Sequence, residues 1–123
     1  WFETTSIPVT TMDLLIEQYG VPDFCKIDVE GFEFEVLSGL STPVRAISVE
    51  FTVPERSDEL VQVINKITEL DNSYVFNYAF GENLALEKES WITADELINI
   101  VRDSDDFKRS QYGDIYAKRT NAV

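Results

Sequence analysis

The sequence predicts an α/β domain in which helices alternate with the strands of a mainly parallel sheet. Residues 24–29 form a short, nearly continuous apolar run, the pattern of a strand covered on both faces. Amphipathic segments separate this run from later apolar runs, which gives the order helix, strand, repeated four times. At 123 residues the chain is long enough for one core and too short for two ordinary domains. We therefore treat residues 1–123 as a single domain.

The first helix is predicted over residues 12–19, with Thr10 or Thr11 as its cap. Gly20 ends this helix, and the central strand at 24–29 follows. The apolar face of the helix, which we expect to pack on the sheet, consists of Met12, Leu15 and Tyr19.

The remaining elements follow the same alternation. Gly31 ends the central strand, and apolar residues recur at helical spacing from Phe32 onward. A helix then lies before the next apolar run, so the two strands are expected to pair in parallel. The later elements are a strand at 44–53, a helix from Ser57 or Asp58 to about 70, a strand at 74–80, a helix opened by the capping box of Thr93 and Glu96, and a strand at 113–118.

Composition excludes several classes of function. The chain has 10 basic and 23 acidic residues, a formal charge of -13 that repels a phosphate backbone and an anionic membrane surface. No apolar run approaches the roughly 20 residues that span a bilayer, and the start carries no secretion signal, so we expect a cytoplasmic protein without nucleic-acid or membrane partners. With no histidine and one cysteine, Cys25, the chain contains no Ser-His-Asp triad, Cys-His nucleophile, histidine-bound zinc or internal disulfide.

The segment after the central strand carries a family resemblance. Residues 26–33, Lys-Ile-Asp-Val-Glu-Gly-Phe-Glu, followed by Val-Leu-Ser-Gly at 36–39, resemble the signature of the FkbM-type methyltransferases. These enzymes use S-adenosylmethionine to methylate hydroxyl groups, often on sugars or secondary metabolites. The resemblance extends to residues 7–15, 47–50 and 113–118, and so spans nearly the whole chain.

The resemblance implies a fold. It predicts part of a class I methyltransferase sheet, which is Rossmann-like and three-layered (α/β/α), with a closing strand inserted antiparallel beside its neighbours. The glycines are scattered singly, so the glycine-rich turn that holds the cofactor is missing. We therefore expect the C-terminal part of a methyltransferase domain, inactive alone, with S-adenosylmethionine bound mostly by residues outside the chain. The first strand then has an open apolar edge, which predicts self-association.

Four carboxylates are the candidate catalytic residues: Asp28, Glu30, Glu33 and Glu50. Three follow the central strand and Glu50 lies near the end of the next, and ligands of open α/β sheets bind beyond the carboxyl ends of the strands. Asp28 and Glu30 are the candidates for the base that takes the hydroxyl proton, or for binding the acceptor. Glu33 is either catalytic or a first-turn structural glutamate.

Glu50 has two interpretations: a contact to the acceptor, or a structural partner for Lys26 or Arg45. Lys26 shares a strand face with Asp28 at about 7 Å, and could orient that carboxylate.

Two other functions remain open at this level. A carboxylate cluster could hold a Mg²⁺-like ion, either in a methyltransferase or in a metal-dependent hydrolase on the same kind of sheet. Alternatively, the acidic surface could make the domain a non-catalytic module that binds a basic partner. The acceptor expected from the resemblance is a small molecule or glycan.

Overall fold

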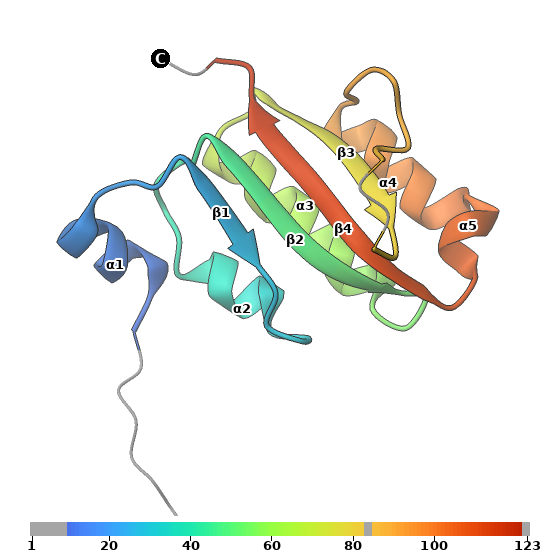
Figure 1. Ribbon diagram of the computed structural model, residues 1–123, viewed down its shortest axis with the longest axis horizontal. Helices are drawn as coiled ribbons and strands as arrows, with labels where there is room; N and C mark the ends of the chain where they lie inside the picture. Colours follow the sequence, from blue (N-terminus) through green and yellow to red (C-terminus); the bar gives the residue numbers. More distant parts are fainter. Residues whose placement is uncertain (1–9, 83–84, 122–123) are drawn as a thin grey trace, which may run out of the picture.

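The computed structural model describes residues 10–82 and 85–121, which form one mixed sheet with helices (Figure 1). The prediction of alternating helices and strands is confirmed, with one short helix, α5, added near the end. The elements are α1 (Met12–Tyr19), β1 (Phe24–Ile27), α2 (Glu33–Ser38), β2 (Ala46–Val53), α3 (Ser57–Leu70), β3 (Tyr74–Phe80), α4 (Ala94–Asp103), α5 (Asp105–Lys108) and β4 (Gln111–Arg119).

The four strands lie in the order β1-β2-β4-β3. β1 and β2 are parallel, as expected for strands joined through a helix. β4 is antiparallel to both of its neighbours, β2 and β3. The last strand of the chain is therefore inserted between two earlier ones, which confirms the predicted antiparallel closing strand.

One face of the sheet is covered by helices. α3 packs between α2 and α4, and these helices lie behind the sheet in Figure 1. Their apolar stripes meet alternate residues of β2 and β4, including Ile47, Val49 and Ile115, which are all buried. At the carboxyl end of β2 the core is aromatic, with the rings of Phe51, Tyr78, Phe80 and Phe107 in contact. Two of the three expected layers, the sheet and one layer of helices, are thus formed by the described residues.

The two edges of the sheet differ. The outer edge of β3 is paired: Phe76 and Ile92 exchange backbone hydrogen bonds of 2.7 and 2.8 Å, and Glu87 N donates to Tyr78 O at 2.8 Å. β1 has no strand on its outer side within residues 10–82 and 85–121, and Phe24 is 54% exposed. Phe24 and the likewise exposed Lys26 share one face of this strand, so the expectation that both of its faces are covered is wrong for the part described.

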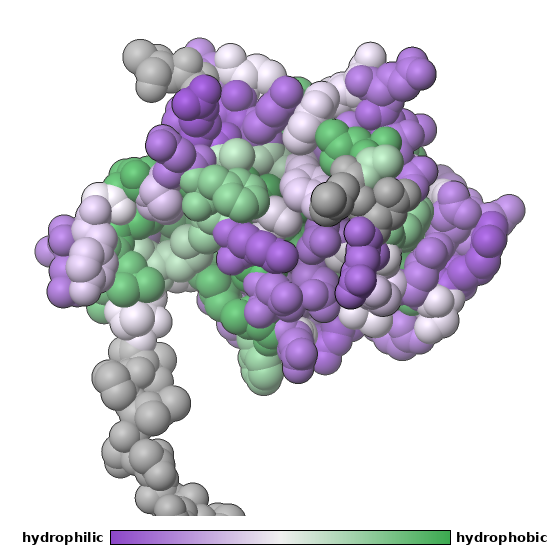
Figure 2. All heavy atoms as spheres, in the orientation of Figure 1, coloured by the Kyte–Doolittle hydropathy of each residue, from purple (hydrophilic) through white to green (hydrophobic). Residues whose placement is uncertain are grey.

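α1 lies beside the sheet instead of on it. Of the face predicted to pack on the sheet, Met12 is partly buried against the core, whereas Leu15 is 43% and Tyr19 77% exposed, so the prediction is wrong for Leu15 and Tyr19. Asp13 fixes the helix to the loop after α2 by accepting from Ser41 N at 2.7 Å and Ser41 Oγ at 2.8 Å. Figure 2 shows hydrophobic side chains gathered over α1 and the β1 edge.

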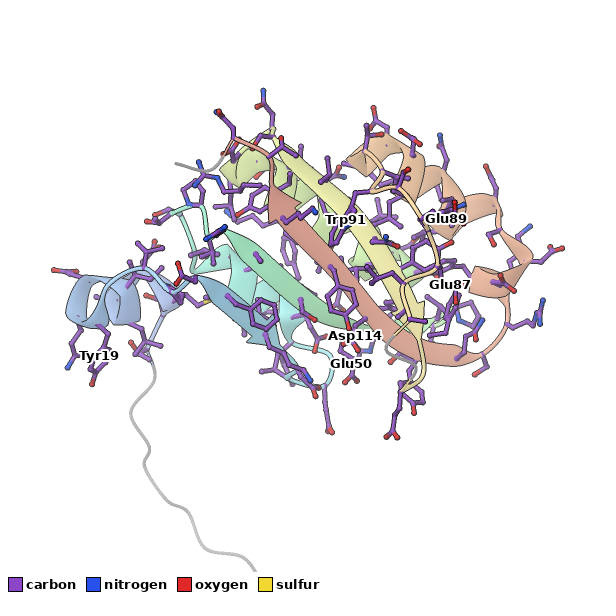
Figure 3. The ribbon with its side chains drawn as sticks, turned by 45° about the horizontal axis from the view of Figure 1, so that its top comes forward. Tyr19, Glu50, Glu87, Glu89, Trp91 and Asp114 are labelled. Atoms are coloured by element: carbon purple, nitrogen blue, oxygen red, sulfur yellow. The ribbon has the colours of Figure 1, made fainter. Side chains whose placement is uncertain are left out.

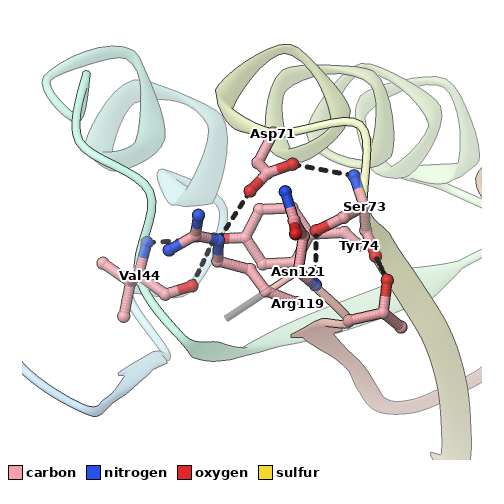
Figure 4. A network of polar contacts seen from close by, with 7 residues as sticks. Val44, Asp71, Ser73, Tyr74, Arg119 and Asn121 are labelled. Carbon is pink, nitrogen blue, oxygen red and sulfur yellow. Dashed lines mark hydrogen bonds and ion pairs between the residues drawn. The ribbon is translucent and has the colours of Figure 1, made fainter. Parts of the chain in front are cut away.

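A polar network closes the end of the sheet at which β2 begins (Figure 4). Arg119 Nε donates to Asp71 Oδ2 at 2.6 Å, while Ser73 N donates to Asp71 Oδ1 at 2.8 Å. These donors, first the Ser73 amide and then Arg119, hold the pKa of Asp71 below its usual value. The hydroxyl of Tyr74 meets the backbone of Val44, both accepting from its amide and donating to its carbonyl. The network ties the start of β3 to the end of β4.

Among the described residues, no helix has both the length and the apolar character needed to cross a bilayer.

The open edge of β1 predicts self-association of the chain, because unpaired strand edges beside apolar side chains recruit further strands. Sedimentation velocity should show a weight-average sedimentation coefficient that rises with concentration. Phe24→Lys places a charge on this edge and should shift the distribution toward monomer. Tyr112→Lys is the matched control, since Tyr112 has a similar exposure of 48% but lies on the inner strand β4. A monomer at every concentration, or equal effects of both variants, would contradict the prediction.

Candidate functional site

The site is built on the turn that follows β1. Its conformation is unusual, because two successive residues have positive φ: 47° at Glu30 and 101° at Gly31. This left-handed pair reverses the chain within a few residues, so that α2 starts at Glu33. Asp28, Val29 and Glu30 are exposed as a result.

The carboxylate of Glu33 holds this turn together. It accepts from Val29 N at 3.0 Å and from Gly31 N at 3.0 Å, and the side chain is buried at 6% exposure. Backbone amides that turn inward need an acceptor, and a carboxylate is a strong one. Of the two predicted interpretations of Glu33, the structure supports the structural one.

Arg56 covers the same turn from the other side. Its Nη1 donates to Gly31 O at 3.2 Å and to Glu59 Oε2 at 3.0 Å. Arg56 also occupies the cap position of α3, where the sequence predicted Ser57 or Asp58, and no side-chain hydrogen bond caps the helix.

Three carboxylates lie in a row across the open face of the sheet. Glu50 on β2 is directly opposite Asp114 on β4, and Figure 3 shows the two side by side. On the other flank of Glu50 is Asp28, which follows the β1 residue paired with Val49 and whose carboxyl is close enough to raise the pKa of Glu50. The row runs perpendicular to the strands, at the carboxyl ends of the parallel pair.

The pKa values of Glu50 and Asp114 in this row are raised. Partial burial is the main cause that raises the pKa of Glu50 from 4.5 to about 7, followed by the hydrogen bond and charge of Asp28, then the charges of Asp114 and Glu33. Burial also raises the pKa of Asp114, while the ammonium of Lys26 acts in the opposite direction. The carboxyl of Glu50 therefore takes up and releases its proton near neutral pH, beside the exposed carboxyl of Asp28.

The four carboxylates predicted to be catalytic do not form one cluster. Asp28 and Glu50 come together, as the parallel pairing implied, and Glu33 binds the turn. Glu30 is exposed at the tip of the turn, and its side chain makes no hydrogen bond or ion pair with the residues that the structure describes. Lys26 lies near Asp114; within the same residues it forms no ion pair with Asp28 or Glu50.

Sequence reasoning missed Asp114 and Arg56. The alternation along 111–119 shows that Asp114 shares a face with Tyr112 and Tyr116, but only the strand register shows that Glu50 lies opposite. For Arg56, the sequence offers only the possibility of an ion pair with Glu59 three positions later.

The residues fit a metal ion poorly. Across the described part of the chain, no group of three or more histidine, cysteine, aspartate or glutamate side chains is arranged to hold one. The structure therefore adds no support for the metal-dependent hydrolase.

The fit to S-adenosylmethionine is partial. An open groove of about 470 Å³ runs beside β1, lined by Met12, Leu15, Cys25, Lys26, Ile27, Asp28, Val29 and Val36. Its lining is mostly apolar and carries one cation, Lys26, and one carboxylate, Asp28; of these, only the carboxylate suits the cationic sulfur of the cofactor. Donors for the amino-acid end of the cofactor, such as a glycine-rich loop, are not found among the residues described.

The sheet order, the antiparallel closing strand and the carboxylates at the ends of the parallel strands define part of a Rossmann-like methyltransferase fold. The sequence model of the methyltransferase FkbM domain matches residues 1–78, which is more than half of the chain. The chain therefore belongs to the FkbM methyltransferase domain family. No curated protein matches it.

Replacing Glu33 by Gln should unlock the turn, because the amide keeps one acceptor oxygen and turns a donor toward the backbone N–H groups. We expect a loss of about 2 kcal/mol in the free energy of unfolding, the range for a hydrogen bond to a charged group. Glu35→Gln is the matched control, since Glu35 lies in the same first turn of α2 but is exposed. Urea unfolding of both variants measures the difference, and equal losses would contradict the role of Glu33.

The raised pKa of Glu50 predicts a pH dependence of stability. The folded state binds this proton more tightly than the unfolded state, so the free energy of unfolding should fall as the pH rises from 4.5 to about 7. Glu50→Gln removes the titrating carboxyl and should reduce the fall in the free energy of unfolding over this pH range. Glu69→Gln, an exposed change at the far end of α3, should leave it intact. Thermal unfolding from pH 4 to 8 tests this, and identical profiles for the two variants would refute it.

Proposed function

We propose that this methyltransferase uses S-adenosylmethionine to methylate a hydroxyl group of a small molecule or glycan, such as a sugar. The observation that supports this proposal is the Asp28–Glu50 pair at the carboxyl ends of two parallel strands, in a chain of the FkbM family. A carboxyl whose pKa is about 7, as at Glu50, is matched to removing the proton of a hydroxyl near neutral pH.

In the proposed reaction, the acceptor hydroxyl lies against Asp28, which is exposed at the end of the groove beside β1. When bound, the cofactor supplies a methyl group on a positively charged sulfur. With the cofactor bound, the Asp28–Glu50 pair would take the proton of the acceptor hydroxyl as the hydroxyl oxygen bonds to the methyl carbon, and the electron pair of the broken C–S bond would stay with sulfur.

The chain's other residues keep this pair in place. Glu33 fixes the turn that carries Asp28, and the sheet register fixes Glu50. Alignment of the reacting groups contributes a large part of the rate of such a displacement. The rest of the cofactor site, in this proposal, belongs to residues outside those described, and a cytoplasmic location stays a prediction.

The proposal is tested by titration calorimetry with S-adenosylhomocysteine, using this chain and a longer form that starts at the natural N-terminus. We expect binding by the longer form alone. In that form, Asp28→Asn and Glu50→Gln should each lower kcat by about 10²- to 10⁴-fold in a methyl-transfer assay, the range for loss of a general base.

Asp106→Asn is the control, since Asp106 is exposed in α5, outside the site. Binding by neither form would overturn the proposed use of the cofactor. Full activity of both site variants would instead favour a non-catalytic role for the carboxylates, as in a module that binds a basic partner.

A further inference from the structure

Arg56 connects the ends of the two parallel strands. Its backbone belongs to the exit from β2, since Arg56 N donates to Thr52 O at 3.1 Å. Its carbonyl accepts from Leu60 N at 3.0 Å in the first turn of α3. Its side chain extends back over the turn that follows β1. One residue therefore spans the loops after β1 and β2, which flank the carboxylate row.

The guanidinium lies directly on Gly31. A Cβ atom at position 31 would lie 2.7 Å from both Cζ and Nη2 of Arg56, which is closer than real Cβ contacts. A side chain at position 31 would displace the guanidinium from this place, and the positive φ of the residue independently favours glycine. Glu59, whose side chain is 23% exposed, holds the guanidinium in this position through Nη1.

Two side chains of opposite charge therefore bind the turn, the carboxylate at its N–H groups and the guanidinium at one of its carbonyl groups. Glu33 accepts from its amides, and Arg56 donates to its carbonyl at Gly31. Asp28 stands at the start of this turn, so its distance from Glu50 depends on how the turn is held. Charge-assisted hydrogen bonds of this kind are stronger and more directional than neutral ones.

We propose that Arg56 is a positioning residue that fixes the turn at 28–31 and thereby holds the Asp28 carboxyl against Glu50. The catalytic meaning of this inference rests on the proposed function, but its geometric content does not. The inference can be tested on the chain itself, without cofactor or acceptor.

A positioning role and a simple charge effect predict opposite changes in the pKa of Glu50 when Arg56 is removed. The charged groups whose fields act on Glu50 are Asp28 after β1, Asp114 on β4 and Glu33 on α2, while Arg56, the cap residue of α3, and Glu59 of α3 line the same small recess. If Arg56 acted only through its charge, its removal would favour the protonated form of Glu50 and raise the pKa. If Arg56 positions Asp28, its removal weakens the carboxyl hydrogen bond and lowers the pKa.

The experiment is an NMR titration of the Glu50 side-chain carboxyl carbon in the wild-type chain, Arg56→Ala and Arg56→Lys. We expect the midpoint to fall from about 7 toward 4.5 in Arg56→Ala, by about one pH unit or more, since a hydrogen bond to a carboxyl shifts its pKa on this scale. Arg56→Lys keeps the charge but loses the guanidinium that bonds both Gly31 O and Glu59, so the Glu50 midpoint should also fall in this variant.

Arg109→Ala is the matched control, since Arg109 also pairs with a carboxylate three positions away, Asp106, but lies outside the site. It should leave the midpoint unchanged. An unchanged or raised midpoint in Arg56→Ala, or a wild-type midpoint in Arg56→Lys, would overturn the inference. A lowered midpoint together with no binding of S-adenosylhomocysteine by the longer form would uphold the positioning role and reject the cofactor proposal.

Discussion

The antiparallel pairing of β4 with both β2 and β3 is the constraint on which the rest of the sheet depends. β4 supplies Ile115 and Ala117 to the helix-covered face and Asp114 to the open face. The fit is close at Gly113, where a Cβ atom would lie 2.2 Å from Ala79 O and 2.7 Å from Phe51 Cζ. A side chain there would force the strands apart, so glycine allows the register that sets Asp114 opposite Glu50.

A second constraint acts on the loop that follows β1. Its turn has two residues with positive φ, and backbone groups in such a conformation find no partner in a helix or sheet. Glu33 and Arg56 supply those partners. The carboxylates of this segment therefore have different roles. Glu33 binds the backbone of the turn, whereas Asp28 faces Glu50 and the groove.

The two edges of the sheet indicate how the domain is extended. β3 is protected by the segment around Ile92, and Trp91 beside it places its ring 4.3 Å from Lys118 Nζ on the open face. β1 has apolar neighbours and a groove that ends at Asp28. In the proposed methyltransferase, the cofactor-binding portion adjoins β1, so the same edge completes the sheet and the reaction site.

The sequence by itself determined the elements apart from α5, the parallel pairing of β1 and β2, and the placement of Asp28 and Glu50 at one edge of the sheet, because these follow from local periodicity and the direction of a βαβ crossover. Only the tertiary structure decided that Asp114 lies in the carboxylate row, that Arg56 covers Gly31 and that α1 lies beside the sheet. Alternation along a strand fixes which face a residue occupies, but a shift of two residues preserves that alternation. The partner across β4 therefore depends on packing between distant segments, such as the contact of Gly113 with Phe51 and Ala79, which no local pattern records.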